Sequence, residues 1–566
     1  MSALPLPTSL AASLLPPLWV EQLRDGLLWA VLVLYLLILF SIAIYGFHRY
    51  VLVFLYCKHR TNVHEPADLD GAELPHVTVQ LPMFNEDLVA ERIINAAAKL
   101  DWPRDRLEIQ VLDDSTDHSA QIAEACVKKW QERGLDISYH HRTDRTGYKA
   151  GALAEGMKTA KGQYIAIFDA DFVPPTDVLY NVVPHFSDDK IGMVQVRWDH
   201  LNRDASLLTK SQAIFLDGHF VIEHTARNRS GRFMHFNGTA GVWRRDTIDD
   251  AGGWQHDTLT EDLDLSYRAQ LKGWQFVYLP QYAAPAELPP EMIAFKQQAH
   301  RWTKGSMQTA LKLLPRILKS KTLPKHVKSE AFFHLTNTIV YPLMVLLTIL
   351  MYPAFILAEA PLKDHPLANW MFGLTLFVLA TCSAATFFAF AQRELFGAKI
   401  GWKSLLYMPF IMALGVGLSL NNTRAVIEAF TTRFSYAKGK KDVRNEFVRT
   451  PKYGVNGRVK GQYNRANVAR DDDLDPTAAP IASAAEFKTP WTFSKLVLPI
   501  LEIAFGCYMA CFVVISIVYS YALFSVPFLF IFSAGYFYVG LSSLLVLWRM
   551  HQEALAEHRE VGMMTA

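Results

Sequence analysis

The sequence lacks a cysteine framework, an excess of charge of one sign, and any internal repeat. Its five cysteines show neither paired spacing nor a C-x-x-C motif, which argues against a disulfide scaffold and a cysteine zinc site. Lysine and arginine nearly balance aspartate and glutamate, 56 against 54, so the chain has no large net positive charge that would indicate nucleic acid as a partner. The absence of repeats and low-complexity tracts excludes solenoid and fibrous classes as well.

Long apolar runs dominate what is present. The 566 residues are 51% hydrophobic and 19% charged, too apolar for a purely soluble protein and too charged for a bundle buried wholly in lipid. Residues 27–47 carry no charge and are long enough to cross about 30 Å of hydrocarbon. Their neutral start and long core differ from a cleaved signal peptide, so we expect a retained span. Further apolar runs follow at 331–358, 367–391, 404–420, 496–520 and 526–548.

Lysine and arginine, which are enriched in cytoplasmic loops, predict the orientation of the chain. Basic residues flank the region between the first two apolar runs on both sides, which places that region in the cytoplasm. Residues 421–495 are also rich in basic residues, and they would lie outside if 404–420 crossed the membrane. We therefore expect 404–430, which proline and glycine interrupt, to be an interfacial or re-entrant helix.

These patterns predict a multi-pass membrane protein with five spans, one soluble domain and the lipid bilayer as a partner. The expected order is an N-terminal segment (1–26), a first transmembrane helix (27–47), a cytoplasmic domain (60–290), interfacial helices (291–328), two transmembrane helices (331–391), the interfacial or re-entrant helix (404–430), a cytoplasmic loop (431–495), two transmembrane helices (496–548) and a cytoplasmic tail (549–566).

Short β-rich runs alternate with helical stretches inside the soluble domain. The runs lie at 77–81, 107–112, 137–141, 164–168 and 193–198. This alternation predicts an α/β domain with a largely parallel sheet, in which ligands collect at the carboxyl ends of the strands. Candidate functional groups are therefore expected just after those runs.

Asp169 and Asp171 follow the run at 164–168 directly. Side chains two apart in an extended strand point to the same side, so both carboxylates can approach one divalent cation. Asp-x-Asp occurs five times in the chain, and a solvated chance pair would explain any one occurrence. The preceding buried-type strand favours a metal site here, where the cation would neutralise a departing nucleoside diphosphate.

Asp113 and Asp114 close the run at 107–112 in the same way. Either could accept hydrogen bonds from a base or ribose, while a helix cap is an equally good explanation. Lys149 lies in a glycine-containing turn that opens a helix, which suits an anion, although a surface lysine would look the same.

Thr260, Glu261 and Asp262 form an acidic motif in a turn-like stretch ahead of an amphipathic segment. Acidic residues at a helix N-terminus are ordinary capping groups, so this motif alone does not indicate a function.

Gln298, Arg301 and Trp302 lie on an expected helix between the soluble domain and the next span. An amphipathic helix on the membrane surface would explain most of this composition. An arginine beside a tryptophan also suits a sugar phosphate, since Arg binds a diphosphate and the indole stacks on a pyranose.

In combination, these motifs form a recognisable constellation: Asp113-Asp114-Ser115, Asp169-Ala-Asp171, Thr260-Glu261-Asp262 and Gln298-x-x-Arg301-Trp302, in that order and followed by spans. It resembles the processive family 2 glycosyltransferases, which include cellulose, hyaluronan and chitin synthases. The segments DRTGYKAGAL, FNGTAGVWRR and LKGWQFVYLP are most similar to the plant glucomannan synthase branch, the cellulose synthase-like A group.

The resemblance implies a GT-A fold, meaning a Rossmann-like mixed sheet, and a role for each matching residue. The nucleotide sugar would contact Asp113, Asp114, Lys149, Asp169, Gln298 and Arg301. Mg²⁺ or Mn²⁺ would bind Asp169 and Asp171, and Asp262 would be the general base in a catalytic motif with Glu261 and Thr260. The acceptor would contact Trp302, Asn237, Gly238 and Thr239.

Residues 447–452 resemble the gating loop of cellulose synthases, with Phe447, Thr450 and Lys452 at matching positions. Arg449 stands where the cellulose synthase motif has valine. A loop of this kind would lie in the cytoplasm, in agreement with the basic residues of 421–495.

Together these features predict a metal-dependent, inverting hexosyltransferase that polymerises a nucleotide sugar into a β-linked polysaccharide and translocates it. UDP-glucose and GDP-mannose both remain open as donor, and β-1,4-glucan and mannan as product. A non-processive enzyme that adds one hexose to a lipid is the alternative, and a transporter or a non-catalytic scaffold is a third. The expected location is the cell membrane, or the Golgi membrane in a eukaryote; the oligomeric state stays open.

Overall fold

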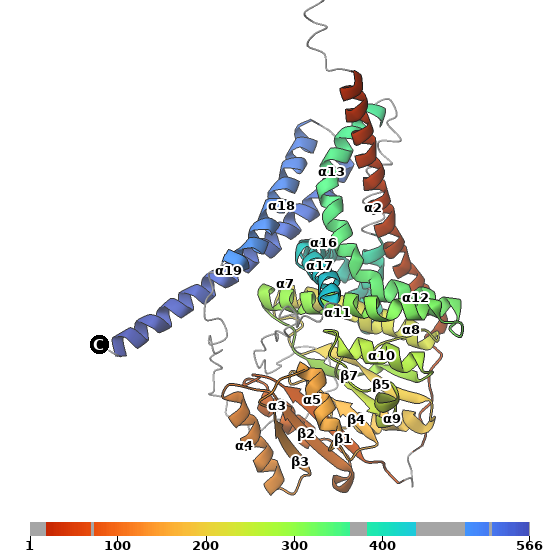
Figure 1. Cartoon of the computed structure of the whole chain (residues 1–566), viewed down its shortest axis with the longest axis vertical. Helices are drawn as coiled ribbons and strands as arrows, with labels where there is room; N and C mark the ends of the chain where they lie inside the picture. Colours follow the sequence, from red (N-terminus) through yellow and green to blue (C-terminus); the bar gives the residue numbers. More distant parts are fainter. Residues whose placement is uncertain (1–17, 69–72, 363–381, 437–492, 520–522, 565–566) are drawn as a thin grey trace, which may run out of the picture.

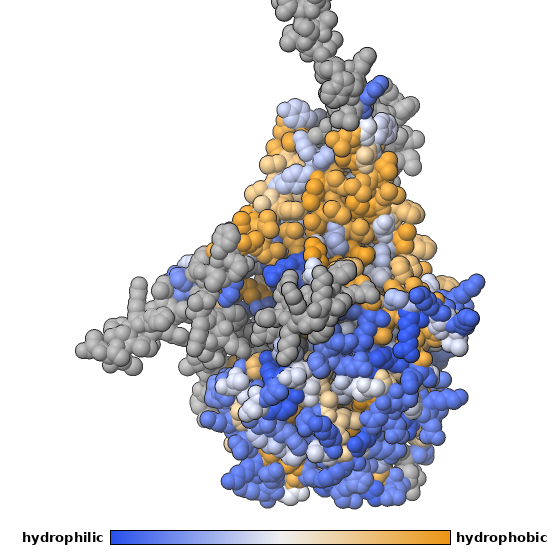
Figure 2. Space-filling model, viewed as in Figure 1, coloured by the Kyte–Doolittle hydropathy of each residue, from blue (hydrophilic) through white to orange (hydrophobic). Residues whose placement is uncertain are grey.

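The computed structural model describes residues 18–68, 73–362, 382–436, 493–519 and 523–564. The gating-like segment 447–452 lies outside these ranges, as does most of the expected span 367–391. A sheet domain occupies one end of the molecule and a group of long helices the other (Figure 1). Apolar residues gather over the long helices and hydrophilic residues over the sheet domain (Figure 2), as expected for a membrane protein with a soluble domain.

The soluble domain is built around one seven-stranded mixed sheet. Its strands are β1 (Val77–Met83), β2 (Leu107–Asp113), β3 (Ile137–His141), β4 (Tyr164–Ile167), β5 (Ile191–His200), β6 (Gly241–Arg244) and β7 (Gln275–Ala286), in the order β3-β2-β1-β4-β6-β5-β7. The five runs expected to form strands all do so. β6, which was not expected, runs antiparallel to both of its neighbours, so the sheet is less parallel than the sequence indicates.

Both faces of the sheet are covered, because β1, β2 and β4 are buried along their whole length. Val79 and Ile109 belong to the core shared with the helices α3 (Ala90–Ala98) and α4 (Ser119–Glu132). The core on the other face is shared with α5 (Tyr148–Met157), α9 (Arg245–Asp250) and α10 (Glu261–Leu271). Short helices α6 (Val178–Val182), α7 (Leu207–Asp217) and α8 (Thr225–Arg229) complete the domain.

Two helices lie between the sheet domain and the upright helices (Figure 1). α11 (Met292–Lys319) carries the predicted Gln-x-x-Arg-Trp motif, and α12 (Lys325–Thr336) packs beside it. α12 leads into α13 (Val340–Leu362), one of the apolar helices. α12 therefore ends beyond the expected boundary at 328, and the interfacial placement of 291–328 stays a prediction.

Five helices in the described ranges are long and apolar enough to cross a membrane: Trp29–His59, Lys325–Phe355, Ala398–Gly417, Lys495–Val518 and Val526–Gln552. The first belongs to α2 (Leu18–His59), which extends well past the expected 27–47 and packs on the soluble domain through Leu52 and Leu55. The last two belong to α18 (Phe493–Val518) and α19 (Val526–Met564).

The segment expected to be interfacial or re-entrant is broken into short pieces. It consists of α15 (Ala398–Ser404), a 3-10 turn (Leu405–Tyr407), α16 (Met408–Gly417) and α17 (Ser419–Tyr436). A Cβ on Gly417 would lie 2.3 Å from the carbonyl oxygen of Gly535, so glycine is required for α16 and α19 to approach this closely. The placement of this segment relative to the membrane stays a prediction.

Candidate active site

A cleft lies at the carboxyl ends of β4 and β7, against the N-terminus of α10 and one side of α11. It gathers most of the residues that the motifs single out from five separate regions of the sequence. Those lining the cleft are Lys149, Asp169, Asp171, Asn237, Gly238, Thr260, Glu261, Asp262, Gln298, Arg301 and Trp302. The position agrees with the rule that ligands collect at this edge of an α/β sheet.

Asp169 and Asp171 follow β4 and both line the cleft. The ammonium group of Lys149 pairs with the Asp169 carboxylate and donates to the carbonyl oxygen of Gly238 at 2.8 Å. The backbone N–H of Asp169 donates to the hydroxyl of Thr239 at 2.8 Å. Residues 238 and 239 therefore hold the lysine and the first aspartate in place.

Asp262 faces this group across Gly238. A Cβ on Gly238 would lie 3.1 Å from Asp262 Oδ2 and 3.5 Å from Lys149 Nζ, and the glycine has a φ of +83°. The small space for a Cβ and this left-handed backbone both favour glycine. Gly238 therefore allows Asp262 and Lys149 to lie at the same end of the cleft. Asp262 Oδ1 accepts a hydrogen bond of 2.8 Å from the N–H of Leu263, which orients the carboxyl group.

The acidic groups of the cleft repel one another. Burial, followed by the neighbouring charge of Glu261, raises the pKa of Asp262 to about 7. Burial also raises the pKa of Glu261. A carboxyl group with a pKa near the working pH is suited to accept a proton during catalysis.

The charges of the acidic groups also act on the pKa values of the basic groups in the cleft. Burial lowers the pKa of Lys149, but Asp169, Glu261 and Asp262 outweigh this and raise it, so the amine stays charged. Burial lowers the pKa of Arg301, and the neighbouring carboxylates, of which Glu261 has the largest effect, offset this only in part.

The carboxyl groups of Asp169, Asp171, Glu261 and Asp262 outnumber the two basic groups, Lys149 and Arg301. This balance, with two carboxylates two residues apart after a strand, fits one divalent cation. The residues present therefore fit the predicted Mg²⁺ or Mn²⁺.

α11 closes the cleft because it approaches the start of α10 very closely. A Cβ on Gly305 would lie 2.5 Å from Cγ2 of Thr260, and the hydroxyls of Thr260 and Thr309 are 3.3 Å apart. Gln298 is buried, whereas Arg301 and Trp302 are partly exposed to the cleft. The motif on α11 thus faces the acidic motif on α10.

Asp113 and Asp114 lie at the end of β2 and do not line this cleft. Asp113 accepts hydrogen bonds from the N–H of Ser115 at 2.9 Å and from the hydroxyl of Tyr139 at 2.8 Å. Asp114 receives two bonds from the guanidinium of Arg142, at 2.7 and 2.6 Å. Neither caps α4, which begins six residues after Asp113 without a side-chain cap, so the helix-cap explanation is wrong. Their role toward a nucleotide stays a prediction.

Sequence reasoning missed one ion pair in the wall of the cleft. Glu287 follows β7 and is 2.5 Å from Arg92 of α3, which also donates to the carbonyl oxygen of Asp171 at 3.2 Å. Glu287 comes directly after a strand, the same signal that identified Asp169. It was missed because β7 was not predicted as a strand.

Comparison with known proteins agrees with the motifs. Residues 75–305 match the family model described as Glycosyltransferase like family 2. Glucomannan 4-beta-mannosyltransferase 2 of Arabidopsis thaliana is 44% identical over 264 residues, which cover 46% of this chain and 49% of the relative. Probable glucomannan 4-beta-mannosyltransferase 11 of Oryza sativa subsp. japonica is 47% identical over 252 residues, 44% of each chain. The chain thus matches about half the length of these curated relatives.

Among solved structures, a mannosyltransferase from Pyrobaculum calidifontis in complex with GDP-Man and Mn²⁺ is similar with 21% identity and a TM-score of 0.46, over 66% of this chain and 99% of that one. The order of the motifs, the mixed sheet and the family match lead to one conclusion. Residues 75–305 form a domain of the glycosyltransferase family 2 type with a GT-A-like mixed sheet, and its sequence is similar to the glucomannan 4-beta-mannosyltransferases.

Proposed function

We propose that this protein is an inverting, processive hexosyltransferase that extends a β-linked mannan or glucan from a nucleotide sugar and passes the product through its own membrane helices. The arrangement of Asp262 carries this proposal. Its carboxyl group, whose pKa is raised to about 7, faces Lys149 and Asp169 across Gly238 in a cleft closed by α11. The names of the relatives favour mannosyl transfer.

The proposed reaction is a single in-line displacement. The acceptor hydroxyl oxygen forms a bond to the anomeric carbon of the donor while the bond from that carbon to the phosphate oxygen breaks. Asp262 takes the hydroxyl proton, and the electron pair leaves with the nucleoside diphosphate. Because the nucleophile enters opposite the leaving group, an α-linked donor gives a β-linked product.

Lys149 and Arg301 would bind the negative charge of the diphosphate, and Arg301 can do so with two parallel hydrogen bonds. Asp169 and Asp171 would hold a divalent cation, which when bound stabilises the charge of the leaving group. Trp302 would offer its indole face to the acceptor sugar and keep the reacting hydroxyl in line.

The position of the cleft supports a polymer product. α11 forms one wall of the cleft and packs against α17, α12 and α19 on its other sides. A chain end that leaves the cleft past Trp302 would therefore meet helices that pack directly against α11. We propose a multi-pass membrane location, with the catalytic domain in the cytoplasm, at the cell membrane or in the Golgi of a eukaryote.

Purified protein in detergent micelles should be incubated with radiolabelled GDP-mannose or UDP-glucose, Mg²⁺ or Mn²⁺, and β-1,4-linked oligosaccharides. We expect a polymer that endo-β-1,4-mannanase degrades. Degradation by β-1,4-glucanase alone would identify a glucan synthase. A single labelled glycolipid from lipid-supplemented reactions would support the non-processive alternative and refute processivity. No transfer from either donor would refute the proposal.

A further inference from the structure

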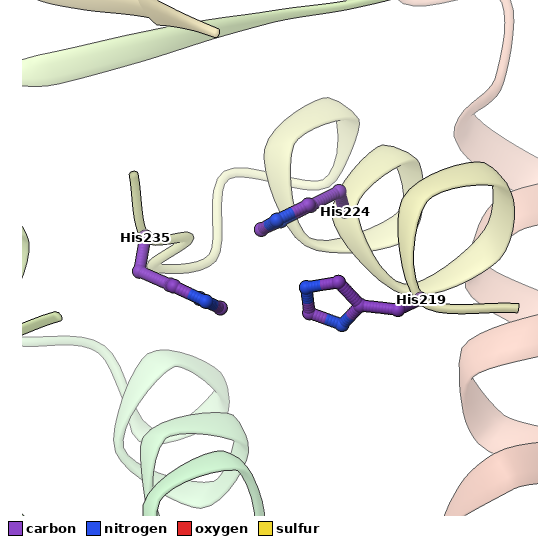
Figure 3. A group of neighbouring side chains, drawn as sticks. All are labelled: His219, His224 and His235. Carbon is purple, nitrogen blue, oxygen red and sulfur yellow. The ribbon is translucent and has the colours of Figure 1, made fainter. Parts of the chain in front are cut away.

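Three histidines lie close together (Figure 3) and contact Asn237, a residue that lines the cleft. His219 and His224 lie five residues apart in the π-helical segment Gly218–His224, and His235 comes from the segment before β6. Five residues are about one turn of a π-helix, so both side chains face the same way, and such turns often occur at functional sites. One ring nitrogen from each histidine lies within 4.8 Å of the others. We call these three residues the histidine cluster.

The side-chain amide of Asn237 contacts all three members of the histidine cluster. Its Oδ1 is 2.5 Å from His224 Nε2, and its Nδ2 is 3.1 Å from the Nε2 atoms of both His219 and His235. An amide oxygen only accepts and an amide nitrogen only donates, with two hydrogens. His224 must therefore donate from Nε2, while His219 and His235 accept at Nε2. The amide uses both of its hydrogens within the cluster.

Glu223 fixes which way round this amide lies. Burial would raise the pKa of Glu223, but the positive charge of Arg227 and the hydrogen bond from His219 outweigh it and hold that pKa well below the usual value. The ionised carboxylate accepts a 2.9 Å hydrogen bond from His219 Nδ1, so the proton of His219 is on Nδ1. A rotated amide would need that proton on Nε2 and would leave Nδ1 facing the carboxylate without a hydrogen.

A group of three histidines also suits a metal ion such as Zn²⁺. Here both nitrogens of His219 are already used, one by Asn237 and one by Glu223, and the other two Nε2 atoms also contact Asn237. The buried guanidinium of Arg227, 3.3 Å from Glu223, adds a positive charge beside the cluster. These contacts favour a hydrogen-bonded cluster over a metal site.

Asn237 is the first residue of the segment 237–239, which contacts Lys149 and Asp169 in the cleft. Its own N–H donates to Oε1 of the buried Gln195 at 3.1 Å. The next residue, Gly238, accepts from Lys149, and the hydroxyl of Thr239 accepts from the N–H of Asp169. The histidine cluster thus secures one end of a three-residue segment whose other contacts fix the lysine and the aspartate of the donor site.

The cluster is also linked to the helices that lead into the membrane. Arg227 donates to Glu330 of α12 at 2.9 Å, and Glu330 is 2.9 Å from His48 of α2. The ring of His334, also on α12, lies 4.8 Å from the ring of His235. This network places the segment at 237–239 in a fixed position relative to α2 and α12.

We propose that Asn237 is a positioning residue, whose amide is held by three neutral histidines and fixes Gly238 and Thr239 against Lys149 and Asp169. This inference rests on the proposed transferase function for its kinetic consequences, but the hydrogen-bond pattern exists without it. Burial holds the pKa values of His224 and His235 well below the usual value, in agreement with neutral rings at the pH of the cytoplasm.

Asn237→Asp tests the proposal, because it keeps the size of the side chain and replaces the amide donor with an acceptor. His219 and His235 must then supply hydrogens from Nε2, which their neutral forms in this arrangement lack. We expect kcat to fall and the donor KM to rise, together by about tenfold to a hundredfold, the range for reversed buried hydrogen bonds. A merely structural loss would lower stability without changing the donor KM.

The pH profile gives a second readout of the same variant. Lowering the pH should partly restore Asn237→Asp relative to the native protein, because a protonated His235 can donate to the new carboxylate. The new aspartate favours that protonation, whereas burial and the neighbouring His334, His224, His219 and Arg227 oppose it. Equal pH profiles for the variant and the native protein would contradict the proposal.

Asn228→Asp is the matched control. Asn228 also donates from Nδ2, to the carbonyl oxygen of Phe276 at 2.6 Å, and accepts from Tyr278 at 3.2 Å, but it lies outside the cleft. We expect lower thermal stability with an unchanged donor KM and pH profile. A second pair separates chemistry from shape: His219→Gln retains an acceptor for Asn237 and should keep most activity, while His219→Leu should lose it.

Nitrogen-15 NMR of histidine-labelled native protein tests the hydrogen-bond pattern if Asn237→Asp fails to fold. We expect a proton on Nε2 for His224 and on Nδ1 for His219 and His235. Other tautomers, or stoichiometric zinc that a chelator removes and His219→Leu lacks, would overturn the proposal. A native protein that binds no donor but shows these tautomers would refute the transferase function and leave the positioning of Asn237 standing.

Discussion

Asp262→Asn is the substitution that tests the mechanism most specifically. The amide keeps the shape of the side chain and cannot take a proton, so transfer should fall by the usual worth of general-base catalysis, about 10² to 10⁴. This corresponds to about 3 to 5 kcal/mol in the activation barrier. Donor binding should stay nearly intact, since Lys149, Arg301 and the Asp169 pair are unchanged. Turnover and nucleotide affinity should be measured on the same preparation.

The raised pKa of Asp262 sets the expected pH dependence. With a pKa of about 7, the base form of free enzyme is about 90% populated at pH 8 and about 10% at pH 6. The native kcat/KM should therefore fall about tenfold between pH 8 and pH 6 as the carboxylate gains its proton. The residual activity of Asp262→Asn should lack this step.

The same pKa has a consequence for stability. Because burial favours the neutral carboxyl group, its stabilising effect is present at low pH and is lost as the pH rises through about 7. The loss begins near the ordinary pKa of 3.8, so Asp262→Asn should raise the thermal midpoint at pH 8 and raise it less at pH 5. Asp257→Asn, an exposed position outside the cleft, is the control and should leave activity and both pH profiles unchanged. Substantial turnover in Asp262→Asn, or an unchanged pH step, would refute the base assignment.

Three further outcomes follow from the same site and from the charge pattern. EDTA should stop transfer and Mg²⁺ or Mn²⁺ should restore it, while Asp171→Ala should need far more metal or lose activity. Full activity in chelator would show that Asp169 and Asp171 have another role. Trp302→Leu should keep its expression and donor hydrolysis but lose elongation, which is checked by measuring diphosphate release and polymer yield side by side. Near-native polymer synthesis would mean that the tryptophan is only an interfacial anchor. Ser435→Cys in a cysteine-free background should resist an impermeant maleimide in sealed cells, and rapid labelling would show that 404–420 crosses.

Three of the five strands that the sequence predicted, β1, β2 and β4, are buried along their whole length. β1 and β2 alternate apolar and polar residues, whereas β4 is a continuous apolar run, and each is found within a few residues of its expected position. β6 is as short as β4, but it has only Val242 and Trp243 between a glycine and an arginine, so it forms no apolar run that would predict a strand. β7 contains Pro280 and Pro285 and pairs with β5 through a register shift, so its sequence does not resemble an inner strand.

The cleft was predictable to the extent that its residues occur in short motifs. The pair at Asp169 and Asp171 and the acidic motif at Asp262 could be located because each follows a strand or begins a helix. The partners of Asn237 could not, since His219, His224 and His235 converge on it only through a π-helical turn and a loop. No pattern in the sequence indicates that turn.

The configuration of the newly formed glycosidic bond tests the central claim most directly. A short acceptor should be extended by one residue with an α-linked nucleotide sugar, and the product examined by NMR. In-line displacement with Asp262 as base predicts a β-linked product, lost in Asp262→Asn and retained in Asp257→Asn. An α-linked product would contradict the account, because it would require retention of configuration and a second nucleophile.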